Sequence, residues 1–209
     1  MTSLESVSVH EPDVPDGVSP DAATSWPPRE LIDSYIGSFD FSAVAADSHV
    51  APGVAREFRD VLGRFASGVT IVTAATGSGP VGMTCQSFSS VSLEPPLVMF
   101  LPAKTSRAWP AMRTAGHFTV NLLASDQEAL SNQFAAKGVD KFAGVSWEPA
   151  PSTGAPRLDG SLAWIDCTIH AVHEAGDHYI VLGRVQELVV GAAEEPLVFY
   201  RSAYHRLAE

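Results

Sequence analysis

The chain has 209 residues, of which 45% are hydrophobic and 18% are charged, and its formal net charge is −11. This composition is typical of a globular protein with a substantial core. An acidic chain without a basic stripe argues against nucleic acid or a membrane surface as a partner. Its two cysteines, Cys85 and Cys167, match no metal-binding spacing, so we expect neither a disulfide framework nor a metal site.

Residues 1–50 form an acidic, proline-rich extension with nine acidic side chains and one basic one. Such a stretch buries too little apolar surface to fold alone, so we expect the extension to be largely disordered. Its segment 29–46 holds several apolar residues and has two interpretations that the sequence leaves open. It is either a short helix that docks on the body or on a partner, or a loosely attached segment. The first residues lack the features of a secretory signal, which favours a cytoplasmic protein.

We expect a single globular domain over residues 51–209. Residues 55–67 carry Phe58, Val61, Leu62 and Phe65 at helical spacing, which predicts an amphipathic helix that ends at Gly68. Strands are predicted at 69–75, 81–88 and 97–101, with a turn at 77–80. No charged side chain occurs from residue 65 to residue 93. The hydroxyl-rich end of this stretch suits a flat, neutral ligand with polar edges, such as a flavin ring.

The second half continues with a helix from about Thr105 to Thr114, although Pro110 favours a start near Trp109. A strand at 117–123 follows, and Ser125 with Glu128 predicts a capping box that opens a helix through residue 136. Two long strands at 162–174 and 178–190 are joined by the hairpin residues Ala-Gly-Asp. Because strands and helices do not alternate, we predict a mainly β fold with peripheral helices, built as a closed or split β-barrel.

Gly77, Gly79 and Gly82 match the dinucleotide-binding pattern G-x-G-x-x-G. That pattern requires a helix that begins at the glycines and an acidic residue at the end of a second strand. No helix is predicted there, and the acidic candidate, Glu94, precedes two prolines. We therefore interpret the glycines as hairpin residues.

Five segments resemble, in order, the short-chain flavin reductases, the reductase components of two-component flavin monooxygenases. They are LGRFASGVTIVTA, GPVGMTCQSFSSVSLEPPLVMF, FTVNLLASDQEALSNQFA, GDHYIVLGRV and PLVFYRSAYHRL, and the resemblance covers residues 55–207. It implies a split β-barrel of the Greek-key, FMN-binding type that forms a homodimer. It also implies an NAD(P)H-dependent flavin reductase (EC subclass 1.5.1), which passes hydride to FMN or FAD and supplies reduced flavin to a separate oxygenase for an aromatic or steroid-type compound.

Several choices stay open on the sequence. It does not decide between FMN and FAD, and the lack of an arginine cluster favours NADH over NADPH. One alternative is a flavoprotein that reduces another acceptor, such as ferric iron. A second alternative is a non-enzymatic flavin-binding carrier or sensor.

Because the cofactors carry the hydride chemistry, the protein needs to bind and orient them rather than supply an acid–base pair. The expected flavin-binding residues on and after the second strand are Thr84, Cys85, Gln86, Ser87, Ser89 and Ser90. By resemblance, residues 84–87 line the ring edge, mostly through backbone groups; the alternative is a polar strand face exposed to water. Lys104, Thr105 and Ser106, with Arg107, suggest a phosphate cradle at a helix start. The alternative there is a plain helix cap with solvated basic side chains.

The remaining candidates come from the resemblance. Asn121 lies in an apolar strand and needs a partner, which the resemblance identifies as the flavin. Ser131 and Phe134 resemble positions near the flavin phosphate or the adenylate, although Phe134 also suits the core. His178 is expected to position the nicotinamide, against the alternative of a solvated hairpin histidine. Tyr204, with Phe199, forms either part of the nicotinamide wall or a dimer contact.

Overall fold

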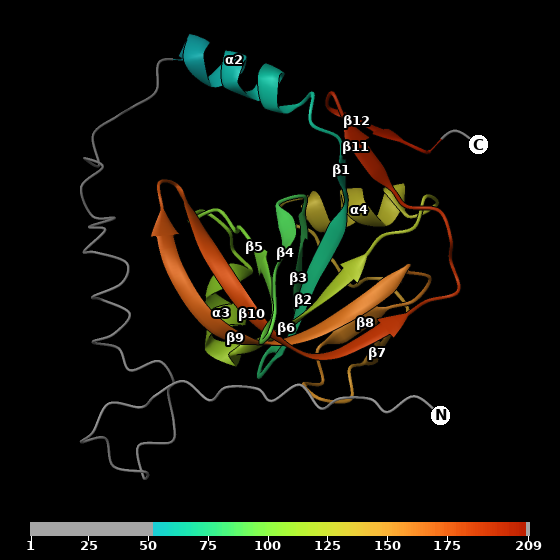
Figure 1. The fold of residues 1–209 in the computed structure, drawn as a ribbon. Helices are drawn as coiled ribbons and strands as arrows, with labels where there is room; N and C mark the ends of the chain where they lie inside the picture. Colours follow the sequence, from blue (N-terminus) through green and yellow to red (C-terminus); the bar gives the residue numbers. More distant parts are fainter. Residues whose placement is uncertain (1–51, 208–209) are drawn as a thin grey trace, which may run out of the picture. The chain divides into compact units, whose positions relative to one another are not determined.

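The computed structural model describes residues 52–207, and the predictions for the N-terminal extension lie outside these residues. Seven antiparallel strands form the main sheet, in the order β3-β2-β6-β9-β10-β5-β4. Their bounds are β2 Thr70–Thr76, β3 Gly79–Cys85, β4 Phe88–Leu93, β5 Pro96–Phe100, β6 His117–Leu122, β9 Ala163–Ala175 and β10 His178–Val190. β3 and β4 are consecutive in the chain but lie at opposite ends of this order, which leaves the barrel split (Figure 1). The prediction of a mainly β, split-barrel fold is confirmed.

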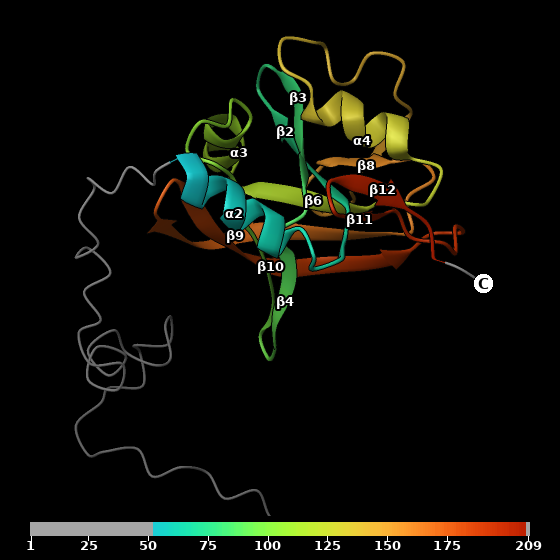
Figure 2. The same ribbon diagram turned by 90° about the horizontal axis from the view of Figure 1, so that it is seen from above.

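Two small sheets and three helices complete the described part. The helices are α2 Pro52–Leu62, α3 Trp109–Ala115 and α4 Glu128–Ala135. One small sheet joins β1 Ser67–Gly68, β11 Val198–Tyr200 and β12 Ala203–His205, and the other pairs β7 Trp147–Pro149 with β8 Pro156–Leu158. Figure 2 shows α3 and α4 on either side of the β2–β3 hairpin, so the outer edge of β3 lies between two helical walls.

Side chains of β2 alternate between two hydrophobic cores. The first core holds Val72 with Phe100, Phe118, Trp109 and Met112, and the Phe100 and Phe118 rings meet edge to face with centroids 4.9 Å apart. The second core lies on the other face of β2 and holds Ile71, Leu123, Phe134, Leu158 and Leu197. Burial on both faces explains why β2 has only apolar and Thr side chains, since period-two alternation sends successive residues into opposite cores.

The glycine pattern lies in a β-hairpin, as predicted. β2 and β3 pair from Thr70–Cys85 to Thr76–Gly79, and no helix follows the glycines. Gly79 has φ +111°, a conformation that favours glycine. The glycines therefore serve the turn, and the dinucleotide interpretation is correctly excluded.

Several local predictions differ from the structure. α2 ends at Leu62, and Gly68 belongs to β1 rather than to a helix end. The capping box at Ser125 is wrong, because the Ser125 hydroxyl pairs with Glu195 at 3.2 Å and α4 begins at Glu128. Gln127 occupies the cap position, and its side-chain carbonyl accepts the Ala124 N–H at 3.0 Å.

Candidate functional site

An open cleft of about 1250 Å³ lies along the outer edge of β3. One wall is the segment between β5 and α3, from Leu101 to Ala108, and the other is α4 with the loop that follows it, residues 136–142. His178 and the C-terminal hairpin residues Phe199, Ser202 and Tyr204 also line the cleft. Five parts of the chain that are separate in sequence therefore meet here.

The edge of β3 offers backbone groups to the cleft, because β3 pairs with β2 on one side only. The Gly82 carbonyl accepts a bond from the Lys141 ammonium at 3.1 Å, so the Gly82 backbone faces away from β2. In an antiparallel strand every second residue points its N–H and C=O to the same side, which places the Thr84 backbone groups on the cleft side too. This is the arrangement that a ligand with a polar edge requires.

Thr84, Cys85, Gln86 and Ser87 all line the cleft, as expected for a ring-edge segment. Their hydroxyls are mostly engaged: Thr84 donates to the Ser131 carbonyl at 2.6 Å, and Ser87 donates to the Leu101 carbonyl at 3.3 Å. These bonds fix the segment to both walls and leave mainly its backbone for a ligand. Ser89 and Ser90 lie beyond the cleft lining on β4, where Ser89 bonds the Ser90 carbonyl at 3.1 Å.

Only part of the expected phosphate-binding segment lies at the cleft. Thr105, Ser106 and Arg107 line the cleft, and Ser106 accepts the Trp109 N–H at the start of α3 at 3.3 Å. Lys104 forms an ion pair with Glu174 at 2.8 Å instead. The hydrogen bond and charge of Glu174 raise the Lys104 pKa, and the same pair lowers the Glu174 pKa. Lys104 thus holds the cleft wall to the β9–β10 hairpin.

Asn121 and Ser131 are fully buried and lie behind the cleft. The Asn121 amide donates to the Ile71 carbonyl at 2.9 Å and accepts the Leu158 N–H at 2.7 Å, so its partner is the protein itself. The expected contacts of Asn121 and Ser131 with the flavin stay predictions. Phe134 is also fully buried, in the second core, and contributes its edge to the cleft wall.

His178 lies at the tip of the β9–β10 hairpin, and the wall segment Pro102–Lys104 is bonded to that tip. Lys104 N–H donates to the Asp177 carbonyl at 2.8 Å, and Tyr179 N–H donates to the Pro102 carbonyl at 2.9 Å. The His178 Nδ1 pairs with the Asp177 carboxylate at 2.7 Å, and this hydrogen bond lowers the Asp177 pKa. The bond to Asp177 therefore fixes the orientation of the imidazole, and His178 lines the cleft.

Tyr204 joins the C-terminal hairpin to α4. Its hydroxyl lies 2.9 Å from the Ser131 hydroxyl and donates to the Asn132 amide oxygen at 3.1 Å. Phe199 packs edge to face on Tyr204 with ring centroids 5.1 Å apart. Both expected residues line the cleft, and their contacts with a nicotinamide stay a prediction.

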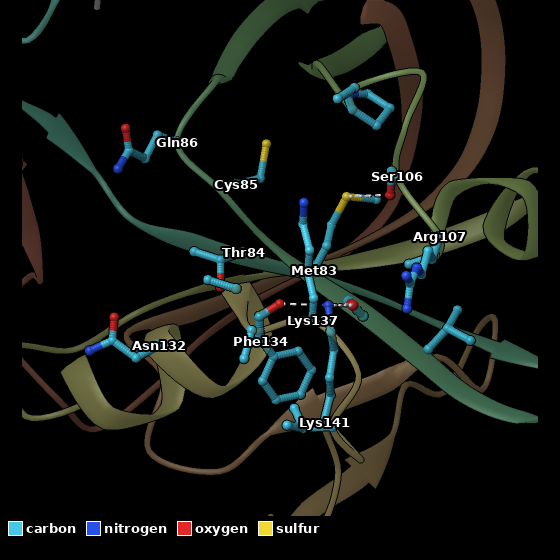
Figure 3. A pocket seen from close by; sticks show the side chains of 18 of the residues that line it. Met83, Thr84, Cys85, Gln86, Ser106, Arg107, Asn132, Phe134, Lys137 and Lys141 are labelled. Atoms are coloured by element: carbon cyan, nitrogen blue, oxygen red, sulfur yellow. Dashed lines mark hydrogen bonds between the residues drawn. The ribbon is translucent and has the colours of Figure 1, made fainter.

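The sequence interpretation missed the loop after α4 and the residues Met83, Pro102 and Asn132, all of which line the cleft. Figure 3 shows Lys137 and Lys141 of this loop close to Met83 and Phe134, with Arg107 contributed by the other wall. The Lys141 ammonium donates to the Phe134 carbonyl at 2.6 Å as well as to Gly82, and burial lowers its pKa. The available signal was the run Lys-Gly-Val-Asp-Lys directly after a helix, because basic side chains are scarce in this chain.

Comparisons with known proteins identify the family. A model described as "Flavin reductase like domain" matches residues 62–208. The chain belongs to the flavin reductase-like family. The reductase subunit HsaB of a flavin-dependent monooxygenase from Rhodococcus jostii is 49% identical over 162 residues, which cover 78% of this chain and 80% of that protein. The predicted resemblance and the predicted class of activity, flavin reduction, are thus confirmed.

Two further relatives of the flavin reductase-like family indicate the cofactors. FMN reductase (NADH) SmoA of Agrobacterium fabrum is 44% identical over 153 residues, which cover 73% of this chain and 86% of that protein. The NADH:FAD oxidoreductase SgcE6 of Streptomyces globisporus C-1027, solved with NAD and FAD fragments, is 38% identical with a TM-score of 0.71. This match covers 76% of this chain and 96% of that structure.

The cleft fits a flavin on its own chemistry. It is roomy enough for a ring and a nucleotide together, its floor presents free strand-edge backbone groups, and basic side chains stand on two walls. Over residues 52–207, no cluster of three or more metal-ligating side chains occurs, and no helix is long and apolar enough to cross a membrane.

Proposed function

We propose that this chain catalyses the reduction of FMN or FAD by NADH and releases the reduced flavin to a separate oxygenase. In the balanced reaction, NADH, a proton and oxidised flavin give NAD⁺ and reduced flavin, which corresponds to EC subclass 1.5.1. The single observation that carries the proposal is the cleft on β3, in a chain that belongs to the flavin reductase-like family.

When both are bound, the nicotinamide supplies a hydride that the flavin accepts, and the protein contributes binding and orientation. The backbone groups of Thr84 and its neighbours would hold the polar ring edge, and the hydroxyl bonds to Ser131 and Leu101 keep that segment rigid. Rigid positioning of two reactants lowers the entropic part of the barrier. Arg107 with Thr105 and Ser106 would hold the flavin phosphate.

His178 would position the nicotinamide. Its Nδ1 is engaged by Asp177, so the other ring nitrogen, Nε2, stands ready for a polar group of the nucleotide. We expect His178→Ala to raise the KM for NADH about fivefold while the flavin KM changes less than twofold, because one hydrogen bond contributes about 1 kcal/mol. Steady-state kinetics with each substrate varied in turn measures this, and an unchanged KM for NADH would remove His178 from the site.

The proposed partners are a second copy of this chain and an oxygenase component that takes up reduced flavin; we place the enzyme in the cytoplasm, where NADH is available. The relative HsaB is named as the reductase subunit of a monooxygenase, which supports the oxygenase partner. The partner's substrate is of the aromatic or steroid type in this proposal.

A matrix of NADH or NADPH against FMN, FAD and riboflavin tests the function, with kcat/KM as the readout. Catalytic reduction of free flavin by NADH supports the proposal. Turnover of tightly bound flavin only with another acceptor, such as ferric iron, would contradict release to an oxygenase. Oxidation of neither nucleotide with any flavin would leave a binding protein rather than an enzyme.

A further inference from the structure

The cleft carries more basic than acidic side chains, although the chain as a whole is acidic. Arg107, Lys137 and Lys141 line it, and Asp140 is its single acidic side chain. The Asp140 carboxylate already accepts the Phe142 N–H at 3.0 Å, while the whole chain carries a net charge of −11. Clustered charge of one sign in a cleft attracts a ligand of the opposite sign, so this cleft selects an anion.

The basic side chains belong to two different walls. Arg107 lies just before α3, whereas Lys137 lies two residues after the end of α4 (Figure 3). Within residues 52–207 neither of them takes part in an ion pair, unlike Lys104. The basic side chain of one wall is sufficient to bind a single phosphate. The basic side chain of the second wall is therefore available to a further negatively charged group.

Lys141 makes the loop that carries Lys137 a fixed structure. Its ammonium binds the Phe134 and Gly82 carbonyls, and the Gln133 side chain donates to the Lys141 and Ala143 carbonyls at 3.0 Å each. The Phe142 ring packs on Phe134 with centroids 5.0 Å apart. These contacts anchor both ends of the loop, so the loop holds the exposed Lys137 in a fixed position at the cleft.

Distance along β3 separates the ring-edge segment from the anchored loop. Gly82, where the loop attaches, lies two residues before Thr84, where the ring-edge segment begins, or about 7 Å at the strand rise. A flavin or nicotinamide ring at residues 84–87 therefore does not reach the whole cleft. The remaining part suits the phosphates of a ligand longer than a mononucleotide.

On these observations, and resting on the proposed function, we propose that Lys137 binds the diphosphate of a dinucleotide in the cleft, opposite Arg107. Two substrates contain this group, NADH and FAD. The Lys137 charge would thus distinguish dinucleotides from mononucleotides that carry the same ring.

Equilibrium binding of four ligands tests this: NADH, reduced nicotinamide mononucleotide, FAD and FMN. The variant is Lys137→Gln, and the matched control is Arg184→Gln, which removes one positive charge from an exposed position on β10 outside the cleft lining. We expect Lys137→Gln to raise the dissociation constant of a dinucleotide about five- to tenfold, the effect of one charge-assisted contact, and to leave its mononucleotide within twofold. Lys137→Arg should retain most of the affinity, and the control should change none of the four.

This experiment distinguishes between NADH and FAD, the two substrates that contain a diphosphate. A loss confined to NADH assigns Lys137 to the nicotinamide dinucleotide, and a loss confined to FAD assigns it to the flavin. Equal changes for a dinucleotide and its mononucleotide, or no change in any ligand, would overturn the inference while the flavin reductase function stands. If the unmodified protein binds none of the four, the proposed function itself fails.

Discussion

Gly82 lies where the cleft wall packs against the second core, and there is no space for a side chain at this position. A Cβ added here would lie 2.5 Å from the Phe134 ring, closer than any real contact of this kind. Phe134 in turn provides one of the two carbonyls that hold Lys141. Packing thus requires a glycine at this position. Its match to the nucleotide-binding pattern is incidental.

We expect Gly82→Ala to lower the free energy of unfolding by about 1–3 kcal/mol, since overpacking a core displaces its side chains. Displacement of Phe134 should also disturb the Lys141 contacts and weaken flavin binding. Gly77→Ala is the control, because a Cβ there has no atom within 4 Å. Urea unfolding and flavin titration measure both effects, and equal stability of the two variants would contradict the packing argument.

Cys167 offers a second test at the scale of one residue. Burial, with a smaller contribution from the charge of Asp166, raises its pKa from an ordinary 9.0 to about 12. In the unfolded chain the thiol ionises above pH 9, whereas in the folded chain it stays neutral. The thiol therefore contributes stability that is fully present below pH 9 and is lost as the pH rises toward 12.

At pH 10 this loss amounts to about 1.4 kcal/mol for one thiol. We expect the free energy of unfolding to fall more steeply from pH 8 to pH 10 in the unmodified protein than in Cys167→Ala. The native thiol should also resist alkylation at pH 8 until the protein is unfolded. Parallel pH profiles for the two proteins would show that the thiol is not protected.

At the scale of elements, the C-terminal hairpin β11–β12 is attached to α4 through one hydroxyl. Tyr204 bonds the buried Ser131 hydroxyl and the Asn132 amide, while its ring packs on Phe199. Since Asn132 and Tyr204 both line the cleft, this attachment fixes part of the site.

Tyr204→Phe keeps the ring and removes both hydrogen bonds, leaving the Ser131 hydroxyl with a missing partner. We expect a loss of about 1–3 kcal/mol in the free energy of unfolding and weaker flavin binding. Tyr200→Phe in the same hairpin is the control, because within residues 52–207 no hydrogen bond involves the Tyr200 hydroxyl. Identical melting temperatures for the two variants would show that the Tyr204 hydroxyl does not attach the hairpin.

Elements with strong local signals were predictable from the sequence. The strands β9 and β10 are each thirteen residues long, contain several β-branched residues and are joined by a turn with a glycine. Both are found within one residue of the predicted bounds. β7 and β8 were missed because each has only three residues and each contains a proline; β8 is held by tertiary bonds such as Leu158 N–H to Asn121. Helix α4 starts later than predicted because the Ser125 hydroxyl bonds to Glu195, 70 residues away, and does not cap the helix.

The same distinction applies to the site. Residues 84–87, 105–107, His178 and Tyr204 were named from local patterns or from the family resemblance, and they line one cleft. Asn121 shows the limit of such reasoning: a buried amide indicates that a partner exists but does not say which one. The basic run at 137–141 is visible in the sequence, but its place at the cleft was not predictable, because a contact between Lys141 and Gly82, 59 residues apart, determines it.

At the scale of the whole molecule, α2 carries an apolar stripe that the other described residues, within 52–207, leave exposed. Phe58, Val61 and Leu62 are 63%, 60% and 53% exposed, although their spacing is that of a helix face that packs on something. Large exposed apolar patches usually mark an interaction site. The proposed homodimer gives this stripe an occupant, a second copy of the chain.

We expect Phe58→Glu combined with Leu62→Glu to convert the dimer to a monomer, because two buried carboxylates without partners cost more than a modest interface supplies. The fold should persist, since these side chains lie outside both cores. Arg56→Gln combined with Asp60→Gln, on the opposite, polar face of α2, is the control and should remain dimeric. Light scattering after size-exclusion chromatography measures the mass, and circular dichroism confirms the fold. A double variant that stays dimeric would place the dimer contact elsewhere on the chain, and the stripe on α2 would then require a different partner.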